Sequence, residues 1–200
     1  NYQSQLWFKK LPHTLTSLTM PLGLLQSQIV PYLPPHITHL RNLNSSSGTQ
    51  SRALEESTPL PEHFFENITS LDCPITNSAL EAFLPKFACL NTLCLDKCDI
   101  QGSILAQLPR TLRNLSLYAS SPFYTPISGI SPDKHLRHLP AGLTALTMSY
   151  LTAPSLDDNI STYSPLLGFL PRALRELCLL RSWGKWNTTK HFANMATHLP

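Results

Sequence analysis

Residues 108–117 read LPRTLRNLSL, and this stretch decides the fold. Its apolar residues follow the template Leu-Pro-x-x-Leu-x-x-Leu-x-Leu. Segments 11–20, 139–148 and 170–179 repeat the template, with methionine as the last residue in the first two of them. Leu-Pro occurs eight times in a chain that has 18 prolines. Because a recurring template is the mark of a repeat architecture, the sequence predicts an array of similar units.

Three further copies fit with small departures. Segment 33–42 places Asn42 at the last position, and the copies that begin at Leu60 and Leu84 reach their leucines four and two residues late. The central positions of the seven copies are Leu18, Leu40, Leu71, Leu93, Leu115, Leu146 and Leu177. They are separated by 22, 31, 22, 22, 31 and 31 residues. Insertions in a solenoid belong in its loops or on its convex side, so the core can remain regular.

The template also predicts local structure. Alternation of the Leu-x-Leu kind predicts a short strand with one buried face. Proline ends a preceding helical turn and lacks a donor, so we expect it just ahead of strand pairing. Segments 27–33, 78–84 and 102–108 carry apolar residues three or four apart and predict helical turns, with Ser27 and Ser78 as N-caps. The Ser/Pro-rich segments 44–61, 120–133 and 152–165 are predicted to be surface loops.

The fourth copy has the fullest motif, Leu90-x-x-Leu93-x-Leu95-x-x-Cys98-x-Ile100, which resembles a leucine-rich repeat. The resemblance covers nearly all of residues 1–200 as a single array. It implies an α/β solenoid, with a parallel sheet on the concave side and short helical or irregular segments on the convex side. Other copies depart from it, with Ser120, Leu151 and Ser182 at the cysteine position. Because Leu-Pro recurs at the last two residues and no caps are recognisable, we expect a fragment of a longer protein.

Composition limits the possible functions. Hydrophobic residues make up 42% and charged residues 14%, with a net charge of +3, which suits a chain with a packed core. No run approaches the roughly 20 apolar residues that span a bilayer. The positive charges are scattered along the sequence, so nucleic acid is not a predicted partner. They include Lys9, Lys10, Arg110, Arg113, Arg172 and Arg175.

Catalytic and metal-binding patterns are weak. No nucleophile, base and acid form a set, and seven scattered glycines make no phosphate-binding loop, so we predict neither an enzyme nor a cofactor. Two His-x-x-His pairs occur, His36 with His39 and His135 with His138. Each pair supplies half of a tetrahedral zinc site, and no further ligands are suitably spaced, so no metal is predicted.

Cysteines and glycosylation sequons bear on the compartment. Cys73 and Cys98 take scaffold positions and are expected to be buried, whereas Cys94 and Cys178 take outward positions. An odd total of five cysteines favours free thiols and a cytoplasmic location. Five Asn-x-Ser/Thr sequons keep an extracellular location as the alternative. They begin at Asn44, Asn67, Asn114, Asn159 and Asn187.

The function that this fold favours is binding to another protein. Degenerate units of variable length are similar to the repeat tails of F-box-type proteins. That resemblance implies a substrate-recognition array of a ubiquitin ligase component. Two alternatives stay open: an extracellular, glycosylated receptor ectodomain that binds a ligand, and a structural spacer.

The partner is expected on the concave face. In a strand written x-Leu-x-Leu-x, the x residues point away from the core, because alternate residues face opposite sides. Most of them are small and polar here. A tyrosine with nearby charges is the exception, and such groups are enriched at binding hot spots. We predict a contact centred on Asp72, Asp96 and Tyr118, with His39 and Arg41 at its margin and Asn114 on the same face.

Overall fold

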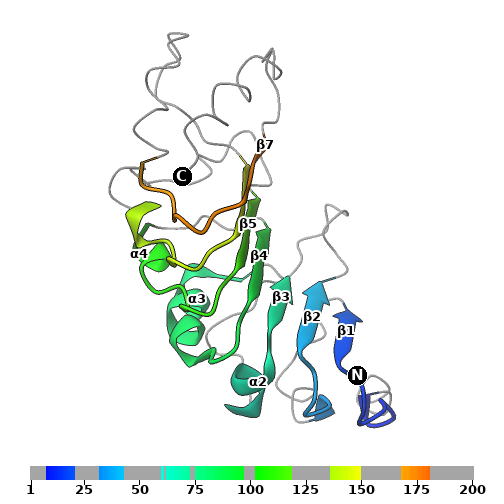
Figure 1. The fold of residues 1–200 in the computed structure, drawn as a ribbon. Coiled ribbons are helices and arrows are strands. Elements are labelled where there is room, and N and C mark those ends of the chain that lie inside the picture. The colour runs from blue at the N-terminus through cyan, green and yellow to red at the C-terminus, as the bar shows by residue number, and fades with distance from the viewer. Residues whose placement is uncertain are drawn as a thin grey trace.

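The computed structural model describes residues 8–20, 32–42, 60, 62–72, 75–96, 102–118, 136–149 and 168–180. Seven strands form one parallel sheet in which spatial order equals sequence order (Figure 1). The strands are β1 (Ser17–Met20), β2 (His39–Asn42), β3 (Ser70–Asp72), β4 (Thr92–Asp96), β5 (Asn114–Tyr118), β6 (Ala145–Ser149) and β7 (Glu176–Leu180). Each strand therefore pairs with the strands of the preceding and following units, as in a solenoid.

The register of the sheet follows the leucine template. Leu18 pairs with Leu40, and the same row continues through Leu71, Leu93, Leu115, Leu146 and Leu177. Burial alternates along the strands, so in β5 Leu115 and Leu117 are buried while the residues between and beside them are partly exposed. The predicted α/β solenoid with a parallel sheet is confirmed.

A tight turn precedes five of the strands. In each one the proline carbonyl accepts a hydrogen bond from the amide three residues later, at 2.9–3.3 Å. The pairs are Pro12 with Leu15, Pro34 with Ile37, Pro109 with Leu112, Pro140 with Leu143 and Pro171 with Leu174. The turn uses the carbonyl of the proline and no backbone N–H at that position, so the missing N–H of proline does not weaken it. The predicted place of proline, just ahead of strand pairing, is confirmed.

Short helices lie on one side of the sheet (Figure 1). They are α2 (Glu62–Asn67), α3 (Asn77–Phe83), η3 (Leu84–Lys86), α4 (Gly102–Leu105) and η4 (Leu136–His138). The predicted helical turns over 78–84 and 102–108 are present as α3 and α4. Helix α2 was not predicted, and it takes up the four-residue insertion of the unit that begins at Leu60.

The predicted N-cap of α3 is wrong by two residues. The cap is Thr76, in an extended conformation, and its Oγ1 accepts a hydrogen bond from the amide of Ala79 at 3.3 Å. Ser78 is the second helical residue, already too far along the chain to cap. Of the other predicted features, Ser27, Cys73 and Cys98 lie outside the described residues, as does most of segment 27–33. The three predicted loop segments lie there too, except for Leu60.

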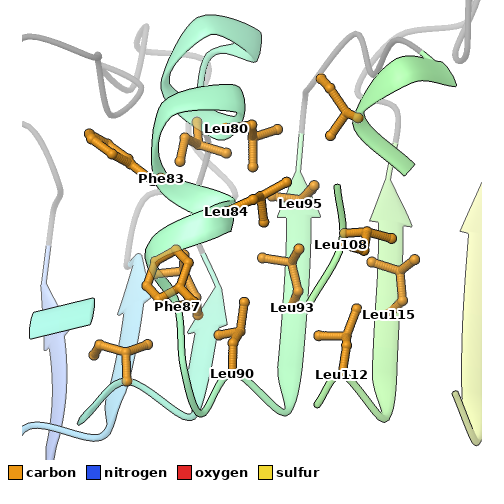
Figure 2. Packing of buried hydrophobic residues seen from close by; sticks show 14 of the residues in the cluster. Leu80, Phe83, Leu84, Phe87, Leu90, Leu93, Leu95, Leu108, Leu112 and Leu115 are labelled. Atoms are coloured by element: carbon orange, nitrogen blue, oxygen red, sulfur yellow. The ribbon is translucent and has the colours of Figure 1, made fainter. Parts of the chain in front are cut away.

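One core runs between the sheet and the helices (Figure 2). The row leucines Leu93 and Leu115 are almost fully buried in it. Phenylalanines fill the space under α2 and α3, where the ring of Phe65 lies 5.4 Å from that of Phe83 and 5.2 Å from that of Phe87, between centroids. Close packing of this kind holds neighbouring units in fixed positions, and it therefore fixes the relative positions of the outward residues of the strands.

Candidate partner-binding face

The outward residues of β1–β7 form a surface that we call the open face. It is the side of the sheet opposite α2, α3 and α4. Its first row consists of Ser17, His39, Ser70, Thr92, Asn114, Ala145 and Glu176. Its second row consists of Thr19, Arg41, Asp72, Cys94, Ser116, Thr147 and Cys178. Most of these side chains are short and can both donate and accept hydrogen bonds.

The second row contains an ion pair between neighbouring strands. Arg41 on β2 and Asp72 on β3 are register partners, and Nε of Arg41 lies 3.0 Å from Oδ2 of Asp72. The arginine side chain is 70% exposed and the aspartate 32%. An exposed pair of this kind adds only about 0.2–1 kcal/mol to stability. The structure thus places Arg41, predicted at the margin of the contact, directly against Asp72, predicted at its centre.

His39 begins β2 in the first row and is exposed. Its Nδ1 lies 2.7 Å from Oγ1 of Thr38, the residue before it. Thr38 itself donates from Oγ1 to the carbonyl of Thr16 in the preceding unit, at 3.2 Å. His39 is therefore oriented by its own chain, one row away from Arg41.

Asn114 forms a second polar group further along the first row. Its Nδ2 donates to Oγ1 of Thr92 at 3.2 Å and to Oδ1 of Asn91 at 3.5 Å. Thr92 is its register partner on β4, so the contact joins two adjacent units. The predicted site did not include Asn91 or Thr92. Thr92 has the same template position as Asn114 in the preceding unit, and Asn91 comes directly before it.

Tyr118 ends β5, and Asp96 ends β4 as its register partner. Tyr118 is half-buried, whereas the side chain of Asp96 lies outside what the structure describes. Asp72 is two strands away from Tyr118, which is about 10 Å at the usual strand spacing, and lies in a different row. The predicted residues therefore form two separate polar groups and one tyrosine on the same face.

A column of carbonyl groups borders the open face where the strands begin. The carbonyls of Thr16, Thr38, Thr69, Asn91, Arg113 and Thr144 each accept two amide hydrogen bonds from the following unit, at 2.8–3.0 Å. Threonines at this position add a third contact, as when Oγ1 of Thr144 donates to the carbonyl of Arg113 at 3.1 Å. The column ties each unit to the next and was not predicted, although threonine recurs at that position of the template.

The described part of the chain was also compared with the requirements for metal binding and membrane insertion. No group of three or more His, Cys, Asp or Glu side chains there could hold a metal ion. Among the helices that the structure describes, none has the length and apolar character to cross a membrane. The side chains of Cys89 and Cys178 are exposed, and neither is in a disulfide with another described cysteine. His135 lies outside the described residues.

Parallel strands stacked through Leu-x-x-Leu-x-Leu segments, with the described helices on one side of the sheet, define a solenoid of the leucine-rich-repeat type. This assignment rests on the register and the core described above. No protein-family model matches the chain, and no curated protein is similar enough to match it. Among solved structures, the chain is similar to the leucine-rich repeat-containing protein LegL7 from Legionella pneumophila, with 15% identity and a TM-score of 0.49. That similarity covers 99% of this chain and 67% of LegL7.

Proposed function

We propose that the chain is a protein-binding array whose partner lies across the open face. The observation that carries the proposal is the continuous seven-strand sheet, since none of the described helices covers its outward rows. Backbone groups within the sheet are already paired, so the surface is formed before a partner arrives. A preformed surface loses little conformational entropy on binding.

The side chains on this face suit close contact with another protein. Short residues such as Ser70 and Ser116 let a partner approach the strands, and their hydroxyls can donate or accept. Tyr118 supplies an aromatic ring at the end of β5, and tyrosine is enriched among the residues that dominate binding energy. The Arg41–Asp72 pair offers both signs of charge to a partner on one side of that ring.

We further propose that the array selects substrates for an F-box-type ubiquitin ligase in the cytoplasm. The support is the similarity of the degenerate Leu-Pro units to the repeat tails of such proteins. The exposed thiols of Cys89 and Cys178 suit a reducing compartment. The amide nitrogen of Asn114, a sequon residue, is already engaged by Thr92.

Affinity capture with three forms of the protein tests the binding proposal. The forms are the wild type, Tyr118→Ala, and Tyr32→Ala as the matched control. Tyr32 is 37% exposed, precedes the turn at Leu33-Pro34 and lies outside the open face. We expect proteins that the wild type and Tyr32→Ala retain but Tyr118→Ala loses, quantified by mass spectrometry. Identical sets for all three forms would place the interaction elsewhere.

The ligase proposal needs its own test. When the protein is depleted from its cells, the partners that depend on Tyr118 should accumulate and carry less ubiquitin. Unchanged abundance and ubiquitination of those partners would reject the F-box assignment and leave the binding proposal standing.

A further inference from the structure

Arginines that are scattered along the sequence come together in the fold. Arg110 and Arg172 each follow the proline of a Pro-x-x-Leu turn, and Arg113 and Arg175 each precede the pairing strand by one residue. These four residues belong to the units of β5 and β7, which flank β6. They occupy the same border of the sheet, where the strands begin. We call this set the arginine edge.

Within the described residues, the arginine edge carries more positive than negative charge. In residues 102–118, 136–149 and 168–180 the acidic residue is Glu176, against the four arginines of the edge. Arg110, Arg172 and Arg175 are exposed, and within the described part of the chain none of their side chains is paired with a carboxylate. Glu176 is in the first row of the open face. An unbalanced, exposed group of guanidinium ions attracts anionic partners.

The side chain of Arg113 extends from the β5 unit toward the β6 unit, which lies between the two arginine-bearing units. Its Nη1 donates to the carbonyl of Gly142 at 3.1 Å and approaches the carbonyl of Arg110 at 3.4 Å. The guanidinium is thereby held over the turn of the β6 unit, which has Ala141 and Thr144 at the positions where the flanking units have arginine. The positive charge is thus continuous along the border of three units.

The spacing of the edge indicates the shape of its ligand. Arg110 and Arg172 are two units apart, which is about 10 Å at the usual distance between strands. One turn of a polyproline II helix takes three residues and rises about 9.3 Å. Carboxylates at every third residue of such a helix would lie on one side and meet arginines at this interval. An extended β-strand would turn its third residue to the opposite side.

We propose that the arginine edge binds an acidic segment of a protein in polyproline II conformation, with a carboxylate at every third residue. This site borders the open face but does not include it, so the inference goes beyond the proposed function. Single-stranded nucleic acid is a poorer match, because its binding surfaces combine positive charge with aromatic stacking. The described residues between the arginines are Thr111, Leu112, Ala141, Gly142, Leu143, Thr144, Ala173 and Leu174, none of them aromatic.

Two peptides of equal composition provide the test. One repeats Glu-Pro-Pro four times, and the other has four consecutive glutamates followed by eight prolines. Each is labelled with fluorescein, and binding to the full chain is followed by fluorescence anisotropy at low ionic strength. We expect the repeating peptide to bind at least threefold more tightly than the blocked one, with an affinity that falls as salt is added.

Charge-matched variants locate the site. Arg110→Gln, Arg172→Gln and Arg175→Gln are combined in one protein, and Lys9→Gln, Lys10→Gln and Lys86→Gln in the control, so that each loses three positive charges. We expect at least tenfold weaker binding of the repeating peptide to the arginine variant and less than a twofold change in the control. Arg172→Gln alone should weaken binding about threefold. This single variant provides the test if circular dichroism shows that the triple variant is misfolded.

Three outcomes would overturn the inference. Equal weakening in the two triple variants would show that peptide binding depends on net charge and not on the arginine edge. Equal binding of the two peptides would show that the spacing of the carboxylates does not matter. Tighter, arginine-dependent binding of an oligouridylate of the same charge would assign the edge to nucleic acid. Tyr118→Ala should leave peptide affinity unchanged, so this inference and the open-face proposal fail independently.

Discussion

The guanidinium of Arg113 lies directly over Gly142, the third residue of the next Pro-x-x-Leu turn. Nη1 donates to the carbonyl of Gly142 at 3.1 Å, and a Cβ at Gly142 would overlap that same nitrogen. A side chain at this position would therefore force the end of the Arg113 side chain to move, whereas the backbone of Gly142 does not adopt a positive φ. The contact joins the units of β5 and β6.

A double-mutant cycle tests this relationship. Gly142→Ala should displace the Arg113 guanidinium and lose about 1 kcal/mol, near the value of one hydrogen bond, and this loss should cancel most of the gain of about 0.4–1 kcal/mol that alanine brings through the unfolded chain. In an Arg113→Ala background the same change should be neutral or stabilising by about 0.4–1 kcal/mol, because alanine lowers the entropy of the unfolded chain. Urea denaturation of the four proteins measures the coupling. Equal effects of Gly142→Ala in both backgrounds would contradict the account.

The row of leucines predicts a gradient of stability along the array. Leu115 is 1% exposed and lies between Leu93 and Leu146, whereas Leu177 on β7 is only partly buried. Leu115→Ala should cost about 2–5 kcal/mol, as expected for a cavity in a packed core. Leu177→Ala should cost less than half as much. Urea unfolding of both variants checks this, and similar losses would argue against a row that is packed most tightly in its middle.

Threonines that join units should differ in importance. Oγ1 of Thr111 donates to the carbonyl of Leu90 at 2.8 Å, so Thr111→Val should cost about 1 kcal/mol. Oγ1 of Thr69 reaches the carbonyl of Thr38, which already accepts two amides and has only two lone pairs. Thr69→Val should therefore cost no more than a few tenths of a kcal/mol, below the usual range. Thermal denaturation of both variants checks this. A larger loss of stability for Thr69→Val than for Thr111→Val would show that a third donor to one carbonyl still contributes to stability.

The sheet could be predicted from the sequence because its determinants are local. Each Leu-x-x-Leu-x-Leu segment specifies a strand with one buried side, and repetition of the template specifies which residues pair. Even the departure at Asn42 preserved the register, since Met20 pairs with Asn42 in the last row. The Leu-Pro dipeptide placed the turns correctly for the same reason.

The helices were harder to predict because they are short and depend on packing. Helix α2 has six residues, too few for a clear apolar period, and it is stabilised by the burial of Phe64 and Phe65. Thr76 and Ser78 are both good N-caps by residue type, and only the position of the buried Leu80 and Phe83 against the sheet decides between them.

The predicted binding residues show a further limit. Alternation correctly assigned Arg41, Asp72 and Asn114 to the open face, because that depends on period alone. Their partners depend on distances between units, which the sequence does not state. The same limit hid the arginine edge, since Arg110 and Arg172 are far apart in sequence but only two units apart in the fold.

Asn114 should carry no glycan. Its Nδ2 donates to Oγ1 of Thr92 and lies near Oδ1 of Asn91, and an N-linked sugar would replace one of the two protons involved. Peptide mapping by mass spectrometry, on the protein purified from its own cells, should find the unmodified Asn114 peptide before and after glycosidase treatment. A glycan at this site would instead favour the extracellular alternative.

The affinity of a partner for Tyr118→Ala tests the central claim most directly. The claim is that the open face binds another protein, with the half-buried Tyr118 as an anchor. Removing a hot-spot residue costs at least about 2 kcal/mol, which corresponds to a Kd about 30-fold weaker. For a partner identified by capture, we predict that loss for Tyr118→Ala and less than a twofold change for Tyr32→Ala, with unfolding midpoints that match the wild type. An unchanged Kd for Tyr118→Ala would contradict the claim.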